Sequence, residues 1–124
     1  MRLKRNRVKQ YYLRSAVPVK DNEGNSYVEY STANPFMAEM WPGGGKVQAE
    51  MYGIRLPNIR NLRMKGEYIE VMCVSGSLGY ALEGGLTFCP GDGICLYSPP
   101  DNEPDYRIVA VYPYNFLTLE VEKI

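Results

Sequence analysis

The sequence predicts a mainly β protein, a small antiparallel β-barrel or sandwich with at most one short helix and long loops. Tyrosine, which favours strands together with valine and isoleucine, occurs 11 times. Nine prolines and twelve glycines divide the 124 residues into short segments, a spacing that suits short strands joined by turns. A chain of this length is typical of one domain, so residues 1–124 are expected to form a single unit with a modest hydrophobic core.

A hairpin is expected first. Residues 8–20 form a strand candidate in which Pro18 indicates an edge position or a bulge. Residues 21–25, with the sequence DNEGN, form a strong turn because Asp and Asn bond their own backbone and Gly accepts positive φ. Residues 26–31 alternate in polarity and complete the hairpin as its return strand.

A second strand pair is expected around the glycine-rich segment 42–45. Residues 36–41 alternate and predict one strand, and residues 46–52 alternate and predict its partner. In the partner strand we expect three side chains to point inward: Val47, Ala49 and Met51.

Helical character is confined to residues 55–65, where one short helix or an irregular turn is expected, since Pro57 suits a first turn and Gly66 a stop. Residues 67–74 predict a strand. Residues 75–85 contain four glycines and no sustained period, which favours a loop or loose hairpin.

The C-terminal third predicts three strands. Residues 93–97 form an apolar strand, and the proline-rich segment 98–104 is a turn that cannot join a sheet interior. Residues 105–112 and 115–122 predict two closing strands, of which the second alternates cleanly.

The charges are unevenly distributed although the net charge is zero. From Gly66 onward two basic residues face nine acidic ones. Residues 1–20 contain seven basic residues and no acidic one, namely Arg2, Lys4, Arg5, Arg7, Lys9, Arg14 and Lys20. A basic end and an acidic end suit head-to-tail contact between copies, or contact of the arm at about residues 1–9 with an acidic partner or DNA. A solvated arm that contacts nothing is the alternative interpretation.

No catalytic, cofactor or metal site is predicted, and we expect a protein that is not an enzyme. Histidine is absent, and no GxSxG elbow supplies a positioned nucleophile. The three cysteines have no metal-like spacing, which argues against zinc and for a reducing compartment, and Cys95 is expected to be a small buried hydrophobe. No apolar run approaches the roughly 18 residues of a membrane span, so no membrane partner is expected.

A second basic cluster could extend the N-terminal patch or line a DNA channel: it comprises Arg55, Arg60, Arg63 and Lys65. Basic residues interleaved with Tyr11 and Tyr12 could clamp nucleic acid, although tyrosine-rich strands also form ordinary sheet faces. Trp41 is a candidate interface anchor and equally a candidate core residue.

Three segments together resemble the head-tail joining (head closure or stopper) family of long-tailed bacteriophages and prophages. They are VQAEMYGIRL (47–56), GDGICLY (91–97) and PDYRIVAVYPYNFLTLEV (104–121). The resemblance implies a β-barrel-like subunit with a flexible loop, assembled in the bacterial cytoplasm and located in the virion neck. It also implies a ring of copies under the portal and adaptor, contact with tail or tail-completion proteins, and closure of the channel around packaged double-stranded DNA.

The segment 75–90 departs from the family pattern and is a candidate gating or interface loop, with the candidate residues Ser75, Gly76, Gly79, Tyr80, Gly84 and Gly85. The alternative function is a small OB-like or SH3-like barrel that binds nucleic acid, which would show tight, salt-sensitive DNA binding by the monomer.

Overall fold

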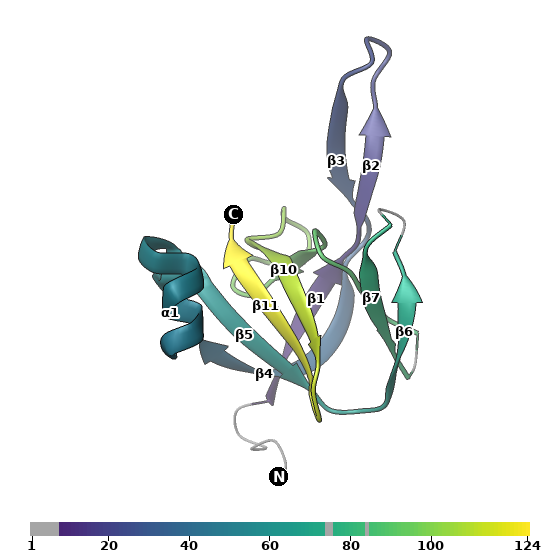
Figure 1. The fold of residues 1–124 in the computed structure, drawn as a ribbon. Coiled ribbons are helices and arrows are strands. Elements are labelled where there is room, and N and C mark those ends of the chain that lie inside the picture. The colour runs from purple at the N-terminus through teal and green to yellow at the C-terminus, as the bar shows by residue number, and fades with distance from the viewer. Residues whose placement is uncertain (1–7, 74–75, 84) are drawn as a thin grey trace.

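The computed structural model describes residues 8–73, 76–83 and 85–124. Its centre is a closed antiparallel barrel in the strand order β1-β4-β5-β11-β10-β9, which confirms the predicted mainly β barrel (Figure 1). The barrel strands are β1 (Val8–Arg14), β4 (Asn34–Pro42), β5 (Ile59–Met64), β9 (Gly93–Cys95), β10 (Tyr106–Pro113) and β11 (Leu117–Lys123).

Two smaller sheets extend the barrel. The strands β2 (Ala16–Lys20) and β3 (Ser26–Tyr30) pair as a hairpin that projects away from the barrel in Figure 1. The strands β6 (Tyr68–Met72), β7 (Leu78–Leu82) and β8 (Thr87–Phe88) form an antiparallel sheet beside it.

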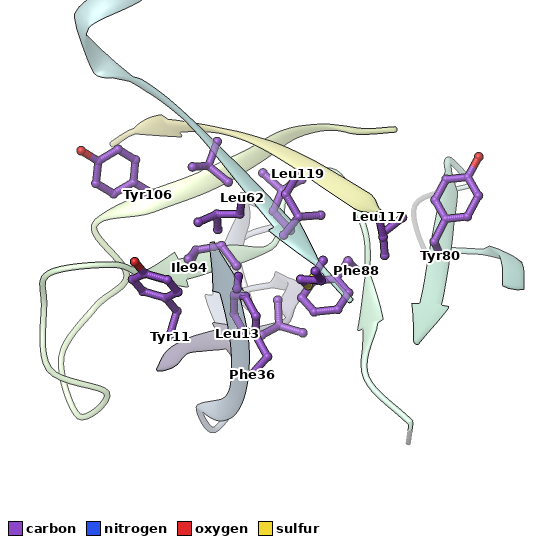
Figure 2. Close-up of a cluster of buried hydrophobic side chains, with 14 residues drawn as sticks. Tyr11, Leu13, Phe36, Leu62, Tyr80, Phe88, Ile94, Tyr106, Leu117 and Leu119 are labelled. Carbon is purple, nitrogen blue, oxygen red and sulfur yellow. The ribbon is translucent and has the colours of Figure 1, made fainter. Parts of the chain in front are cut away.

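The hydrophobic core joins the barrel to the β6–β8 sheet. Phe88 of β8 is fully buried, and its ring meets Phe36 of β4 edge to face with centroids 5.2 Å apart. Tyr80 of β7 belongs to the same cluster as core residues of the barrel strands, and Figure 2 shows these side chains together. The sheet therefore contributes side chains to the barrel core and does not form a separate core.

Strand β11 is buried on both faces. Its inward residues Leu117, Leu119 and Val121 lie in the core. Its outward residues Thr118, Glu120 and Glu122 are also buried, because the helix α1 (Lys46–Tyr52) and the 3-10 helix η2 (Gly53–Asn58) lie beside that face and contact it through side chains. The clean alternation of residues 115–122 predicted a strand but not the burial of its polar face.

The strand predicted over residues 46–52 is wrong, because these residues form α1. Val47 and Met51 are 70% and 57% exposed, and Ala49 is exposed as well, so none of the three points inward. The polar residues Gln48 and Tyr52, four positions apart on one helix face, contact the barrel instead.

The helix predicted over residues 55–65 is also wrong for most of its length. Pro57 lies inside η2, which ends at Asn58, and the chain then becomes β5. Strand β5 pairs with both β4 and β11 and buries Ile59, Leu62 and Met64. This burial between two neighbouring strands determines its conformation, whereas the local apolar spacing suits a helix.

The first predicted strand, residues 8–20, is divided at Ser15 into β1 and β2. The hairpin return strand, the strand at 67–74 and the three C-terminal strands are present as β3, β6, β9, β10 and β11, with ends shifted by up to two residues. Residues 75–85 are expected to form a loop or loose hairpin, and the second alternative is the nearer one, because Leu78–Leu82 form β7, which pairs antiparallel with β6 and β8.

The cysteines differ from expectation in one respect. Cys73 and Cys89 form a disulfide that connects the end of β6 to the residue after β8. Their spacing of 16 residues matched no metal motif, and the sequence argument for a reducing compartment overlooked this pairing. Cys95 is a free, buried thiol in the barrel, as predicted.

Candidate functional site

The helix α1 and η2 are attached to the barrel through polar side chains. Gln48 and Tyr52 lie one turn apart on α1 and reach Glu120 of β11, and Arg55 of η2 reaches Glu122. Gln48 Nε2 donates to Glu120 Oε2 at 2.6 Å, and the Tyr52 hydroxyl donates to Glu120 Oε1. Gln48 also exchanges amide hydrogen bonds with Asn61 of β5, at 2.8 and 3.2 Å.

Glu122 forms the second contact between this segment and β11. Arg55 donates to both of its oxygens, from Nε at 2.6 Å and from Nη2 at 2.5 Å, and Arg107 approaches it at 3.5 Å. A bidentate guanidinium–carboxylate pair is geometrically specific. This pairing lowers the pKa of Glu122, first through the hydrogen bond from Arg55, whereas burial and the neighbouring Glu120 raise the pKa of the Tyr52 hydroxyl.

The lowered pKa of Glu122 predicts a pH-dependent contribution to stability. Because the folded-state pKa lies below the unfolded value, the stabilisation is present above the unfolded pKa of about 4.3 and is lost as the pH falls through the folded value. The wild type should therefore melt above the variant Glu122→Gln at about pH 6, and the difference should shrink towards about pH 3. Thermal melts of both proteins across this range would check it, and a difference that stayed constant would contradict it.

A cleft of about 610 Å³ lies between α1 and the outer face of the sheet. Its floor includes Thr118 and Glu120 of β11 and Asn61 of β5. The helix α1 lines it with Val47, Gln48 and Met51, and a second wall carries Tyr112 and Tyr114, whose rings stack with centroids 5.4 Å apart. The cleft therefore combines a buried carboxylate with aromatic and apolar walls.

The basic residues predicted to form a second patch do not gather on one face. Arg55 is paired with Glu122, and Arg60 donates to the backbone carbonyls of Pro57 and Ile59. Because side chains alternate along a strand, Arg60 lies on the face opposite that of Asn61 and Arg63. Arg63 lines the cleft and lies over the ring of Trp41, 5.5 Å from its centroid, and Trp41 is half-buried and outside the main hydrophobic cluster.

The projecting hairpin is a second candidate surface. Tyr27 and Val28 of β3 are 46% and 54% exposed, and Val17 of β2 is exposed as well. Several hydrogen bonds hold its base to the barrel. Among them, Arg14 Nε donates to the Ser31 carbonyl at 2.8 Å, Ser31 N donates to the Ser15 carbonyl at 2.9 Å, and Ala16 N donates to Asp92 Oδ1 at 2.9 Å. The base is thus firmly attached, while the apolar side chains beyond it are about half exposed, and Val28 lines a cavity of about 410 Å³ together with Met72 and Cys73.

The candidate gating loop is largely structural where it is described. Tyr80 is buried, and Gly79 belongs to β7, where an added Cβ would lie under 3.0 Å from the sulfurs of both Cys73 and Cys89. Gly76 and Gly85 lie in turns and have positive φ angles of 86° and 106°. Ser75 and Gly84 lie outside the described residues, as do the four basic residues of the N-terminal arm: Arg2, Lys4, Arg5 and Arg7.

Sequence reasoning missed the residues that build the cleft, above all Gln48, Tyr52 and Glu120. One signal was present: Gln48, Tyr52 and Arg55 are polar or amphipathic at positions i, i+4 and i+7, the spacing of one helix face. The competing alternation of Val47, Ala49 and Met51 matched a strand equally well.

Within residues 8–73, 76–83 and 85–124, no group of three or more Cys, Asp or Glu side chains is arranged to hold a metal ion. No helix in this part of the chain is long and apolar enough to cross a membrane. No protein-family model matches the sequence, and no curated protein or solved structure matches it significantly.

Proposed function

We propose that this chain is a structural component of the head-tail connector of a long-tailed bacteriophage or prophage. In this role it joins the DNA-filled capsid to the tail and closes or lines the DNA exit channel, as one copy in a ring between the portal or adaptor and the tail proteins. It acts in the virion neck after assembly in the host cytoplasm, and its work is assembly and not catalysis.

The observation that carries the proposal is the projecting β2–β3 hairpin. An isolated two-stranded hairpin is marginally stable in water, and this one exposes Val17, Tyr27 and Val28. Exposed apolar surface on a projecting arm is typical of a subunit that buries the arm against a neighbour. Contacts between unlike surfaces of successive copies close into a ring when the rotation between them closes.

The segments that resemble the joining family support the same proposal, because they coincide with defined elements. GDGICLY spans β9, and the segment 104–121 supplies β10 and most of β11, so both build the barrel. The segment VQAEMYGIRL spans α1 and the first residues of η2, which border the cleft.

The nucleic-acid-binding alternative is less well supported by the described surface. Arg55 is occupied by Glu122, and Arg60 and Arg63 lie on opposite faces of β5. A continuous basic groove, which single-strand binding by a small barrel requires, is therefore not formed by these three residues.

The deciding experiment deletes this reading frame from the prophage that carries it and images the induced lysate by negative-stain electron microscopy. We expect separate DNA-filled heads and finished tails, which join when the purified protein is added. Normal infectious virions would overturn the proposal. Tight DNA binding by the isolated protein that falls steeply with salt would favour the alternative.

The same complementation assay tests the hairpin. The double variant Tyr27→Ser with Val28→Ser should fold normally, because both side chains are exposed, yet fail to restore joining. Met37→Ser on β4, another exposed apolar position, is the matched control and should restore it. Full restoration by the hairpin variant would remove the hairpin from the connector interface.

A further inference from the structure

The helix α1 has its faces reversed relative to an ordinary surface helix. Its polar side chains contact the barrel, and it buries none of its residues. Val47 and Met51, one turn apart on α1, form an apolar stripe that is 70% and 57% exposed, and Ile54 of η2, beyond the end of the helix, is 97% exposed. A helix of seven residues gains its stability from packing, so an unpacked apolar stripe on it is typical of a surface that binds something.

The stripe borders the cleft. Val47 and Met51 form its helical wall, and Tyr114 and Phe116 also line it. Tyr114 is exposed, so a ligand in the cleft would cover apolar surface of both pairs. A cleft of about 610 Å³ is large enough for several side chains of an extended peptide.

The cleft floor carries a negative charge. Glu120 is 2% exposed and accepts hydrogen bonds from Gln48, Tyr52 and Tyr112, all of which are uncharged donors. Neither of the two ion pairs found in the described part of the chain involves it. A carboxylate has about four acceptor positions, so Glu120 can accept a further bond from a cation.

We propose that this cleft binds an extended segment of a partner protein in which a lysine or arginine lies between apolar side chains. The apolar side chains pack between Val47 and Met51 on one wall and Tyr114 and Phe116 on the other. The cation lies near the stacked rings of Tyr112 and Tyr114 and pairs with Glu120.

The cleft is lined by one carboxylate, Glu120, and one guanidinium, Arg63, and their separation determines where a cation of the partner can lie. In the register of β5 and β11, Glu120 lies opposite Asn61, whereas Arg63 lies opposite Thr118, two residues further along. Two residues of strand span roughly 7 Å. The cation of the partner is therefore directed to the Glu120 end, away from Arg63, and this site does not depend on the connector proposal.

The test measures binding of a fluorescein-labelled peptide, GLKLRLG, to the full chain by fluorescence anisotropy. We expect saturable binding with a dissociation constant on the order of 10–100 µM, weakened by added salt. The peptide GLELELG should not bind, because it reverses the charge. The peptide GSKSRSG should bind at least about tenfold more weakly, because it lacks apolar side chains.

Variants of the protein locate the site. Met51→Ser should weaken binding roughly fivefold without affecting the fold, because the side chain is mostly exposed, and Ile69→Ser, exposed on β6, is the matched control with no effect. Glu120→Gln should weaken binding about tenfold, and circular dichroism shows whether this variant is folded. Binding that is absent, insensitive to Met51→Ser, or equal for GSKSRSG would overturn the proposal.

Discussion

The variant Phe88→Ala is expected to lose about 3–5 kcal/mol of unfolding free energy, a large part of the stability of a domain of this size. Phe88 has no exposed surface and packs edge to face against Phe36 in the barrel. Its removal leaves a cavity where the β6–β8 sheet meets the barrel, and β8 is only two residues long and cannot fill it. Urea denaturation followed by tyrosine and tryptophan fluorescence gives the free energy of unfolding.

The matched control is Leu78→Ala in the neighbouring strand β7, where the side chain is partly exposed. It should cost well under half as much, since less apolar surface is returned to water. Two separate unfolding transitions in the wild type would contradict the single shared core from which the prediction for Phe88 follows.

Reducing the Cys73–Cys89 disulfide is expected to lower the unfolding free energy by roughly 3 kcal/mol. The bridge joins residues 16 apart, and closing a loop of this length restricts the unfolded chain by about that amount. Denaturation with and without dithiothreitol measures the difference, and mass spectrometry after thiol alkylation confirms the redox state.

The double variant Cys73→Ser with Cys89→Ser supplies the control. It should match the reduced wild type in stability and should not respond to dithiothreitol. Cys95 is a buried free thiol and is retained in both proteins, so a response confined to the wild type belongs to the bridge. A wild type whose stability is unchanged by full reduction would contradict the prediction.

Strands with a clean local signal could be predicted from the sequence. The alternation in residues 115–122 corresponds to β11, and the turn DNEGN corresponds to the hairpin turn, where the Asp21 side chain accepts hydrogen bonds from the backbone of Glu23 and Asn25. In each of these segments a pattern of a few residues is sufficient, because the turn chemistry or the two faces of one strand are specified locally.

The candidate site could not be predicted in the same way, since its geometry depends on distant partners. Residues 46–52 fit a strand by alternation and a helix by the spacing of Gln48 and Tyr52, and the two patterns conflict. What favours the helix is contact with Glu120, 72 residues away from Gln48. Distant partners also determine the conformation of Ile59–Met64. This segment forms the strand β5 because β4 and β11 pair with it, one on each side.

The burial of strand β11 and its pairing on both sides predict slow hydrogen exchange. The strand is paired with β5 and β10, and six of its seven residues are buried, so its amides should exchange with solvent only when the whole domain opens. Leu119 faces the core and Glu120 faces the cleft. The exchange of the backbone amides along β11 therefore depends on the stability of both regions. Deuterium uptake along residues 117–123 would therefore measure global stability, while uptake in α1 would report separately on whether the helix stays attached.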